Sequence, residues 1–514
     1  MKKILFPMFL FLISCTLTAQ TQAYIKVTEH GAIDHIERII SGGYITTGYD
    51  SAFKAQVIRW DDQFNAVWKY RFTDANITGY PQSIVEANDG SFYYLTASRE
   101  NTGSTLIVKF SSSGSILWQK KYYLSSGNMN SIALSKASGT DNGFLFGGGQ
   151  CTLSNYIIKC SSNGNMEWQY QYYYPLASGV ITCWSIIPDG NNYIVSSGYN
   201  INSLLTFKLD ATGNVLSHSA YTYDGMQIVP TRIVKLSSTG GYAVLGNYNS
   251  SNNNKTEFVA FYNFSFNMLS FNELTVTYKQ FVLWDITAVN NGDNVVVNGG
   301  IMDDNDKSYA ALINLSGNGS VFWKKMAEGN SSLSNKNVEF RGVVQKGTTT
   351  VNTGYGFNEG CVMAVIDANG NGLCNDVTFD LTNVHRTLTL QSQTITVIPA
   401  TPLMASVNYS GTTGVSSMKE VICGSIGSVE DVTGKNPINI YPNPADDVIH
   451  ISGCEHQLIK IAVYNLTGEQ VSAFRSADSE HEILIKNLKP GYYLVRIFTG
   501  ESNSETSVLP LLIF

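Results

Sequence analysis

Charged residues are scarce in this 514-residue sequence: Asp, Glu, Lys and Arg make up 14% of it, and the formal net charge is −7. Lys and Arg form no basic stripe, so nucleic acid is not an expected partner, since phosphate binding draws on clustered basic side chains. No run of 18 apolar residues occurs after the N-terminal segment, and we therefore expect no transmembrane helix in the mature chain. The length predicts two or more domains.

The common catalytic and metal-binding motifs are also missing. The sequence has no HExxH zinc motif, no GxSxG nucleophile elbow and no CxxC pair. These absences favour a non-enzymatic protein over an enzyme, and we expect no cofactor. The alternative is a glycan-active hydrolase or lyase whose catalytic residues are scattered over loops.

The N-terminus predicts export. Lys2 and Lys3 precede an apolar run, Ile4–Ile13, that is too short to span a bilayer and is typical of a signal peptide over 1–19. Cleavage after Ala19 is our preferred interpretation, and a lipoprotein that begins at a lipidated Cys15 is the alternative. Eight cysteines are present, and if Cys15 leaves with the signal peptide, at least one of the other seven stays unpaired.

What the sequence has in abundance is a repeat. An apolar strand, a polar turn and often a Trp four residues later recur, with turn positions at 64, 114, 164, 213, 266, 319 and 370. Each unit contains four strand-like runs joined by Gly, Asn and Ser turns, which is typical of antiparallel hairpins. One four-stranded sheet cannot bury both of its faces, whereas seven packed radially can. We therefore predict an all-β fold with a seven-bladed β-propeller over 20–385.

Two further features fit this arrangement. Trp68, Trp118, Trp168 and Trp323 recur in register, and we interpret them as aromatics packed between sheets, with a stacked ligand platform as the alternative. The segment 24–28 has the pattern of an orphan fourth strand and is predicted to close the ring by pairing near residues 343 to 367. The repeat resembles those of secreted bacterial propellers and departs from the WD and kelch patterns.

One turn offers a metal candidate. Asp367, Asn369 and Asn371 match the first half of a calcium loop, but Thr378 stands where the bidentate Glu of such a loop belongs. The same stretch is in register with six other hairpin turns. We therefore prefer a plain turn and expect no resident metal.

The repeat ends near residue 385. Residues 386–433 are rich in Thr, Ser, Val and Gly and are predicted to form an extended linker that is in part strand-paired. A compact β unit is expected over 434–514. Its residues alternate between apolar and polar in 459–464 and 492–497, as a half-buried sheet requires.

This unit closely resembles the type A C-terminal sorting domain of the type IX secretion system. The resemblance spans 437–500 and rests on three motifs in order, YPNPA, GxxV and LxxGxYxV. The motif residues are Tyr441, Pro442, Asn443, Pro444, Gly468, Val471, Leu488, Gly491 and Tyr493.

The resemblance implies passage through an outer-membrane translocon, removal of the sorting domain, and a cargo that is released or attached to surface lipopolysaccharide. We therefore expect a secreted or outer-surface protein whose partners are the type IX secretion machinery and an unidentified glycan or protein ligand. An Ig-like adhesion module that stays on the mature protein is the alternative.

Overall fold

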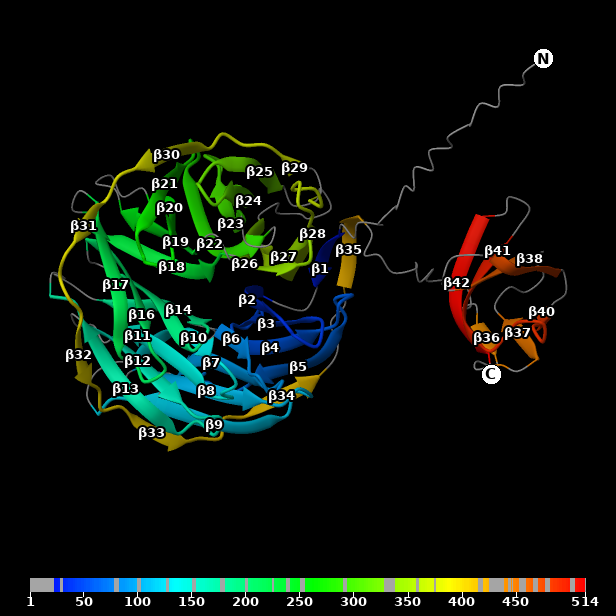
Figure 1. Ribbon diagram of the computed structural model, residues 1–514, viewed down its shortest axis with the longest axis horizontal. Helices are drawn as coiled ribbons and strands as arrows, with labels where there is room; N and C mark the ends of the chain where they lie inside the picture. The colour runs from blue at the N-terminus through cyan, green and yellow to red at the C-terminus, as the bar shows by residue number, and fades with distance from the viewer. Residues whose placement is uncertain are drawn as a thin grey trace, which may run out of the picture. The chain divides into compact units, whose positions relative to one another are not determined.

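The computed structural model of this chain is built from β-strands (Figure 1). It describes residues 23–27, 31–424 and 439–513, except for 78–82, 99–102, 126–128, 150–153, 176–180, 199–201, 224–225, 237–240, 250–254, 290–293, 328–337, 357–359, 374–375, 415–418, 442–444, 446, 453–458, 466–469, 477–480 and 500–503. Within these ranges there is no helix, and so none that could cross a membrane. The chain divides into two compact units, Met1–Ile426 and Gly427–Phe514, which we describe separately.

The first unit is a seven-bladed β-propeller, as predicted. Six blades contain four consecutive antiparallel strands each, and the seventh contains three consecutive strands and β1. The strands, in blade order, are β2 (Ala32–Arg38), β3 (Tyr44–Tyr49), β4 (Ala55–Trp60), β5 (Ala66–Phe72); β6 (Ser83–Glu86), β7 (Phe92–Ser98), β8 (Ser104–Phe110), β9 (Ile116–Tyr123); β10 (Asn130–Lys136), β11 (Phe144–Gly149), β12 (Ser154–Cys160), β13 (Met166–Tyr173); β14 (Thr182–Asp189), β15 (Asn192–Gly198), β16 (Ser203–Leu209), β17 (Val215–Thr222); β18 (Ile228–Lys235), β19 (Tyr242–Asn249), β20 (Lys255–Tyr262), β21 (Met268–Thr275); β22 (Gln280–Val289), β23 (Asn294–Met302), β24 (Ser308–Ser316), β25 (Val321–Ala327); and β26 (Val338–Lys346), β27 (Thr349–Gly356), β28 (Gly360–Ile366), β1 (Ala23–Val27).

The first strand of each blade lies at the axis of the ring (Figure 1). These innermost strands, β2, β6, β10, β14, β18, β22 and β26, contact their neighbours all the way around. The hydrophobic core is divided into seven clusters, one between each pair of neighbouring blades. The repeat period therefore reflects a sheet that buries its faces only against two other sheets.

One contact between neighbouring blades recurs, and we call it the blade joint. The indole N–H of Trp68 donates to the Ser112 carbonyl in the next blade, and Trp118 reaches Ser162 in the same way, at 3.0 and 3.2 Å. The equivalent bonds of the other two joints are Trp168 to Ala211 at 2.9 Å and Trp323 to Ala368 at 2.8 Å. The packing interpretation of these tryptophans is thus the one that the contacts support.

The tryptophan of such a joint packs against the turn glycine of the next blade. Gly114 has φ of +86°, and a Cβ on it would lie 2.6 Å from the ring of Trp68. Phe64 and Phe266 replace the glycine in blades 1 and 5, which follow blades 7 and 4, two of the three blades that have no such tryptophan. Phe64 stacks on Tyr44 instead, with ring centroids 5.1 Å apart, so a side chain of the blade itself fills the position of the missing indole.

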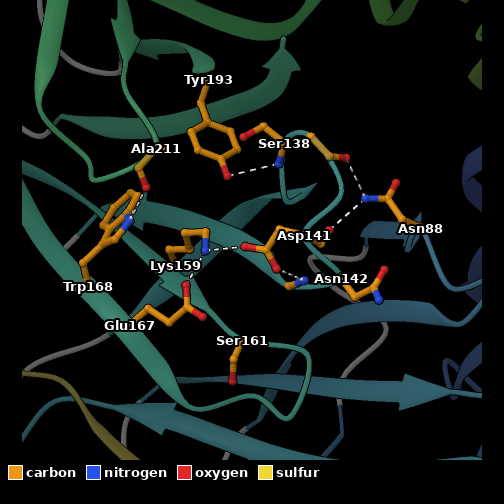
Figure 2. A network of polar contacts seen from close by, with 12 residues as sticks. Asn88, Ser138, Asp141, Asn142, Lys159, Ser161, Glu167, Trp168, Tyr193 and Ala211 are labelled. Carbon is orange, nitrogen blue, oxygen red and sulfur yellow. Dashed lines mark hydrogen bonds and ion pairs between the residues drawn. The ribbon is translucent and has the colours of Figure 1, made fainter. Parts of the chain in front are cut away.

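Polar contacts add to the joints at the same end of the blades (Figure 2). The Lys159 amine lies 2.5 Å from Asp141 and also pairs with Glu167 within blade 3. Asn88 of blade 2 donates to the Asp141 carbonyl at 2.8 Å, and Tyr193 of blade 4 accepts the Ser138 N–H at 3.1 Å. One turn is therefore held by three blades.

The ring closes through the N-terminal strand. β1 pairs antiparallel with β28, from Ala23 opposite Val365 to Val27 opposite Cys361. The predicted pairing of this segment with the last blade is confirmed. Closure by a strand from the far end of the chain removes the open edge that blade 7 would otherwise present.

Residues 376–424 form a belt around the propeller, drawn in yellow to orange in Figure 1. The belt adds a fifth strand to every blade, in the reverse of the blade order, from blade 6 down to blade 1 and then to β1 of blade 7. Its strands are β29 (Asp376–Val377), β30 (Thr382–Arg386), β31 (Thr389–Gln391), β32 (Thr396–Pro399), β33 (Leu403–Ser406), β34 (Gly411–Gly414) and β35 (Lys419–Gly424).

The belt corrects the expectation of a linker over 386–433, because its part up to Gly424 belongs to the propeller. Side chains fix it in place. Arg386 pairs with Glu273 of blade 5 at 2.7 Å, and Gln119 of blade 2 both donates to and accepts from the Tyr409 backbone, at 3.0 and 3.1 Å. The physical reason is the unpaired N–H and C=O groups that a four-stranded blade exposes along its outer edge.

The second unit contains a three-stranded sheet and a four-stranded sheet around one apolar core. The small sheet has the order β36–β37–β40 and the large one β39–β38–β41–β42. The strands are β36 (Asn439–Tyr441), β37 (Val448–Ser452), β38 (Ile459–Asn465), β39 (Gln470–Ser476), β40 (His481–Leu484), β41 (Gly491–Thr499) and β42 (Ser504–Ile513).

The turn glycines provide a first test of the blade joint. We expect Gly114→Ala to lower the free energy of unfolding by about 3 kcal/mol. The added methyl group would clash with the Trp68 ring, and alanine at a positive φ is itself unfavourable. Gly90→Ala is the matched control, since Gly90 has φ of +76° but no atom within 4 Å of the added Cβ. It should cost about 1 kcal/mol. Equal losses in urea unfolding would show that the indole contact contributes nothing.

A truncation tests the belt. A chain that stops after residue 375 lacks every fifth strand, and we expect it to melt on the order of 10 °C lower and to aggregate through its exposed edges. A chain that stops after Ile426 keeps the belt and loses only the second unit. Its propeller should melt as in the full chain. Indistinguishable melting of the two truncations would mean that the belt is not needed for stability.

Candidate functional site

The innermost strands carry the irregularities that build the candidate site. In six of them the pairing with the second strand shifts by one residue, which is a β-bulge. In the seventh, β6, the residues just before Ser83 lie outside the described ranges. The six bulge residues are Asp34, Ile132, Trp184, Thr231, Trp284 and Arg341.

Each bulge residue is partly exposed, while the residue before it is buried. A bulge re-aims one side chain away from the sheet that it interrupts. The bulges thus bring six side chains of five chemical kinds to one level of the ring, around its axis. Trp284 is the most exposed of the six, with 41% of its surface accessible.

Arg341 lies at the centre of an arginine cage formed with Asp34, Glu339, Trp284 and Tyr355. Its Nη1 is 2.8 Å from Asp34 Oδ1, and its Nε is 3.3 Å from Glu339 Oε1. Its guanidinium carbon lies 5.3 Å from the ring centroid of Trp284 and 5.5 Å from that of Tyr355. The cation therefore sits among two carboxylates and two aromatic rings from blades 1, 6 and 7.

Arg232, His35 and Asp285 form a cross-axis triad, and each lies one residue after the bulge residue of its strand. Arg232 of blade 5 donates from Nη2 to His35 Nδ1 of blade 1 at 3.0 Å, and its Nε is 3.3 Å from Asp285 Oδ1 of blade 6. Because a guanidinium only donates, Nδ1 is the acceptor, and the ring proton lies on Nε2. Nε2 then donates to the Ile84 carbonyl of blade 2 at 3.2 Å.

Two carboxyls at the axis have raised pKa values. Burial raises the pKa of the Asp285 carboxyl above its usual range, and Arg232 opposes the shift. Burial also raises the pKa of the Asp34 carboxyl, with Arg341 opposing it. Asp285 is further held by the backbone N–H groups of Val343 at 3.0 Å and Ile286 at 2.9 Å. The triad groups are thus engaged with each other and with the backbone, whereas Trp284 is the most exposed of the six bulge side chains.

The calcium candidate has the geometry of a turn. The Asp367 carboxylate accepts the backbone N–H groups of Asn369 and Asn371, both at 2.8 Å, and the Asn371 side-chain amide at 2.9 Å. The hairpin turn at Asp210 repeats this arrangement with Thr212 and Asn214. Throughout the described ranges, no group of three or more His, Cys, Asp or Glu side chains is placed to hold a metal ion.

Five of the sorting motif residues lie in the described part of the second unit. Leu488 packs against the core, Gly491 pairs with Ile513 of the last strand, and the Tyr493 hydroxyl donates to the Lys489 carbonyl at 2.7 Å. Tyr441 pairs with His450, and Val471 is 39% exposed on β39. The remaining motif residues, Pro442, Asn443, Pro444 and Gly468, lie outside the described residues, as does the signal peptide over 1–19.

Reasoning from the sequence missed the axial residues. The sequence does carry a signal for them. Before the second strand of several blades, the same three-residue pattern recurs: the bulge residue, one residue after it that breaks the alternation, and then Ile or Val. Asp34-His-Ile, Trp284-Asp-Ile and Arg341-Gly-Val are instances. Comparing the blades at this position would have located the site.

Comparison with protein families identifies the second unit. Residues 439–509 match the family described as "Secretion system C-terminal sorting domain". The chain therefore carries a type IX sorting domain and is exported by that system to the cell surface or the extracellular space. No curated protein matches the chain.

Solved structures that resemble the chain include Raptor from Chaetomium thermophilum, at 10% identity and a TM-score of 0.44, covering 68% of this chain and 30% of that one. A second is PorZ, a bacterial surface component of the type-IX secretion system of Porphyromonas gingivalis, at 10% identity and a TM-score of 0.37, covering 92% of this chain and 69% of that one. A third is a protein of unknown function from Bacteroides caccae, at 12% identity and a TM-score of 0.32, covering 59% and 93%. The chain thus spans less than a third of the Raptor chain, and the fold assignment rests on the strand pairing described above.

The sorting domain can be tested by truncation. A chain that stops after Ile426 keeps the whole belt and lacks the sorting unit. We expect it to accumulate in the periplasm, because the outer-membrane step has lost its signal. Cell fractionation and surface proteolysis measure this, with the full chain as the control. Surface display of the truncated chain at the normal level would refute the sorting role.

Proposed function

We propose that the propeller is a non-enzymatic binding module that acts outside the cell, in adhesion to a glycan or a protein. One observation carries the proposal: Trp284 exposes 41% of its surface at the inner edge of the ring, while the charged groups beside it are paired with one another. A large aromatic side chain beside a few fixed polar groups is typical of ligand sites.

Delivery completes the proposal. The signal peptide over 1–19 directs the chain across the inner membrane, and the sorting domain carries the propeller and its belt to the outside. Removal of the sorting domain then leaves the propeller as the working part. Release and attachment to surface lipopolysaccharide both fit this scheme.

An extracellular glycan-active enzyme is the second candidate. Two features of Asp34 favour it. Burial raises the pKa of the Asp34 carboxyl, and Asp34 and Glu339 both pair with Arg341. A pair of carboxyl groups, one of them with a raised pKa, is a common acid–base arrangement in glycoside hydrolysis. Asp34 is engaged with Arg341, however, and this favours a structural role for the pair.

An array of glycans and surface proteins, probed with the mature full chain, tests the binding function. We expect retention of at least one class of ligand without turnover, because the polar groups at the axis are engaged. Release of reducing ends from a retained glycan, lost in Asp34→Asn, would favour the enzyme instead. Retention of nothing on the array would contradict the binding proposal.

A further inference from the structure

We propose that the arginine cage and the open face of Trp284 form a site for neutral glycans. This inference rests on the binding function proposed above and adds to it the place and the chemical class of the ligand. The cage offers different contacts to anionic, cationic and neutral ligands.

Anionic ligands are disfavoured by the balance of charge. The cage contains two carboxylates, Asp34 and Glu339, but only one cation, Arg341. Glu37 adds a third carboxylate beside His35, at 3.4 Å from its Nε2. A uronic acid, a sulfate or a phosphate would bring another negative charge to a guanidinium that is already shared.

Cationic ligands find their position occupied. A cation is best held between aromatic faces and carboxylates, and Arg341 fills that position, 5.3 Å from the Trp284 centroid and 5.5 Å from that of Tyr355. An incoming cation would have to displace Arg341 and break its bond to Asp34 at 2.8 Å. The protein thus supplies its own cation to the cage.

What remains suits an uncharged polyhydroxyl ring. The open part of Trp284 offers an apolar face on which the C–H groups of a sugar can pack. The cage presents acceptor and donor groups together, and sugar hydroxyls both donate and accept hydrogen bonds. A hydroxyl can therefore bind to the salt-bridged groups without separating them.

The cross-axis triad sets the depth of the site. Arg232 reaches from blade 5 to His35 of blade 1, so side chains occupy the axis one residue beyond the bulges. Asp285 of blade 6 holds Arg232, and the Ile84 carbonyl of blade 2 holds His35. A ligand contacting Trp284 thus meets a rigid base, which reduces the cost of ordering the site on binding.

The experiment compares three variants on arrayed neutral, acidic and amino-sugar glycans, followed by calorimetry on the best ligand. The mature full chain should prefer neutral glycans, with an affinity that changes little between low and high salt. Trp284→Ala should weaken binding at least tenfold, since an aromatic anchor of a ligand site usually dominates its affinity. Trp284→Tyr keeps an aromatic face and should retain most of it.

Phe322→Ala is the matched control. Phe322 is an aromatic residue of the same blade, 65% exposed on β25, the outermost of its four consecutive strands, so its loss should leave binding unchanged. Melting temperatures establish that the variants fold. Unchanged binding in Trp284→Ala, or a preference for acidic or amino-sugar glycans, would overturn the neutral-glycan site while the binding function stands. Retention of proteins alone would do the same, and retention of nothing would overturn both.

Discussion

The structure depends on the joint by which one blade holds the next. Each blade is a four-stranded sheet with two apolar faces, and the seven core clusters lie between blades, so no blade has a core of its own. The tryptophan and the turn glycine fix the distance between neighbouring blades, and Phe64 and Phe266 show how the same space is filled where the tryptophan is missing. The even spacing of the repeat follows, because the position of the turn relative to its strand determines whether the next blade fits.

The features that the sequence predicts are those whose signal is local and repeated. One pattern that recurs about every fifty residues predicts the number of units, the turns and the closing strand, because each copy can be aligned with the next. The belt escapes such reasoning because its strands are only two to six residues long and pair with strands far away in the chain, so none of them shows a clear alternation. It does carry a weaker signal: Leu381, Leu388, Ile395, Pro402 and Tyr409 are spaced by seven residues, one for each blade passed, and all are at least partly buried.

The candidate site lies beyond sequence reasoning for a different reason. His35 and Arg232 are separated by 197 positions and meet only because blades 1 and 5 face each other across the axis. A bulge also shifts the alternation by one residue, so Trp184 and Trp284 have the pattern of core residues in the sequence although they are partly exposed. The sorting motif is the opposite case, since its residues lie within one small unit and can be identified without any knowledge of the fold.

The joint and the belt also explain where this protein can vary. The turn glycines and the tryptophans, in the blades that have them, hold neighbouring blades together, and the belt strands cover the outer edge of every blade, so a change at any of them affects the ring. The bulge positions differ from blade to blade, and they hold Asp, Ile, Trp, Thr, Trp and Arg in six blades of otherwise similar construction. A propeller of repeated units thus places its dissimilar side chains together at the axis. That is where a ligand can be distinguished without disturbing the contacts that hold the blades in place.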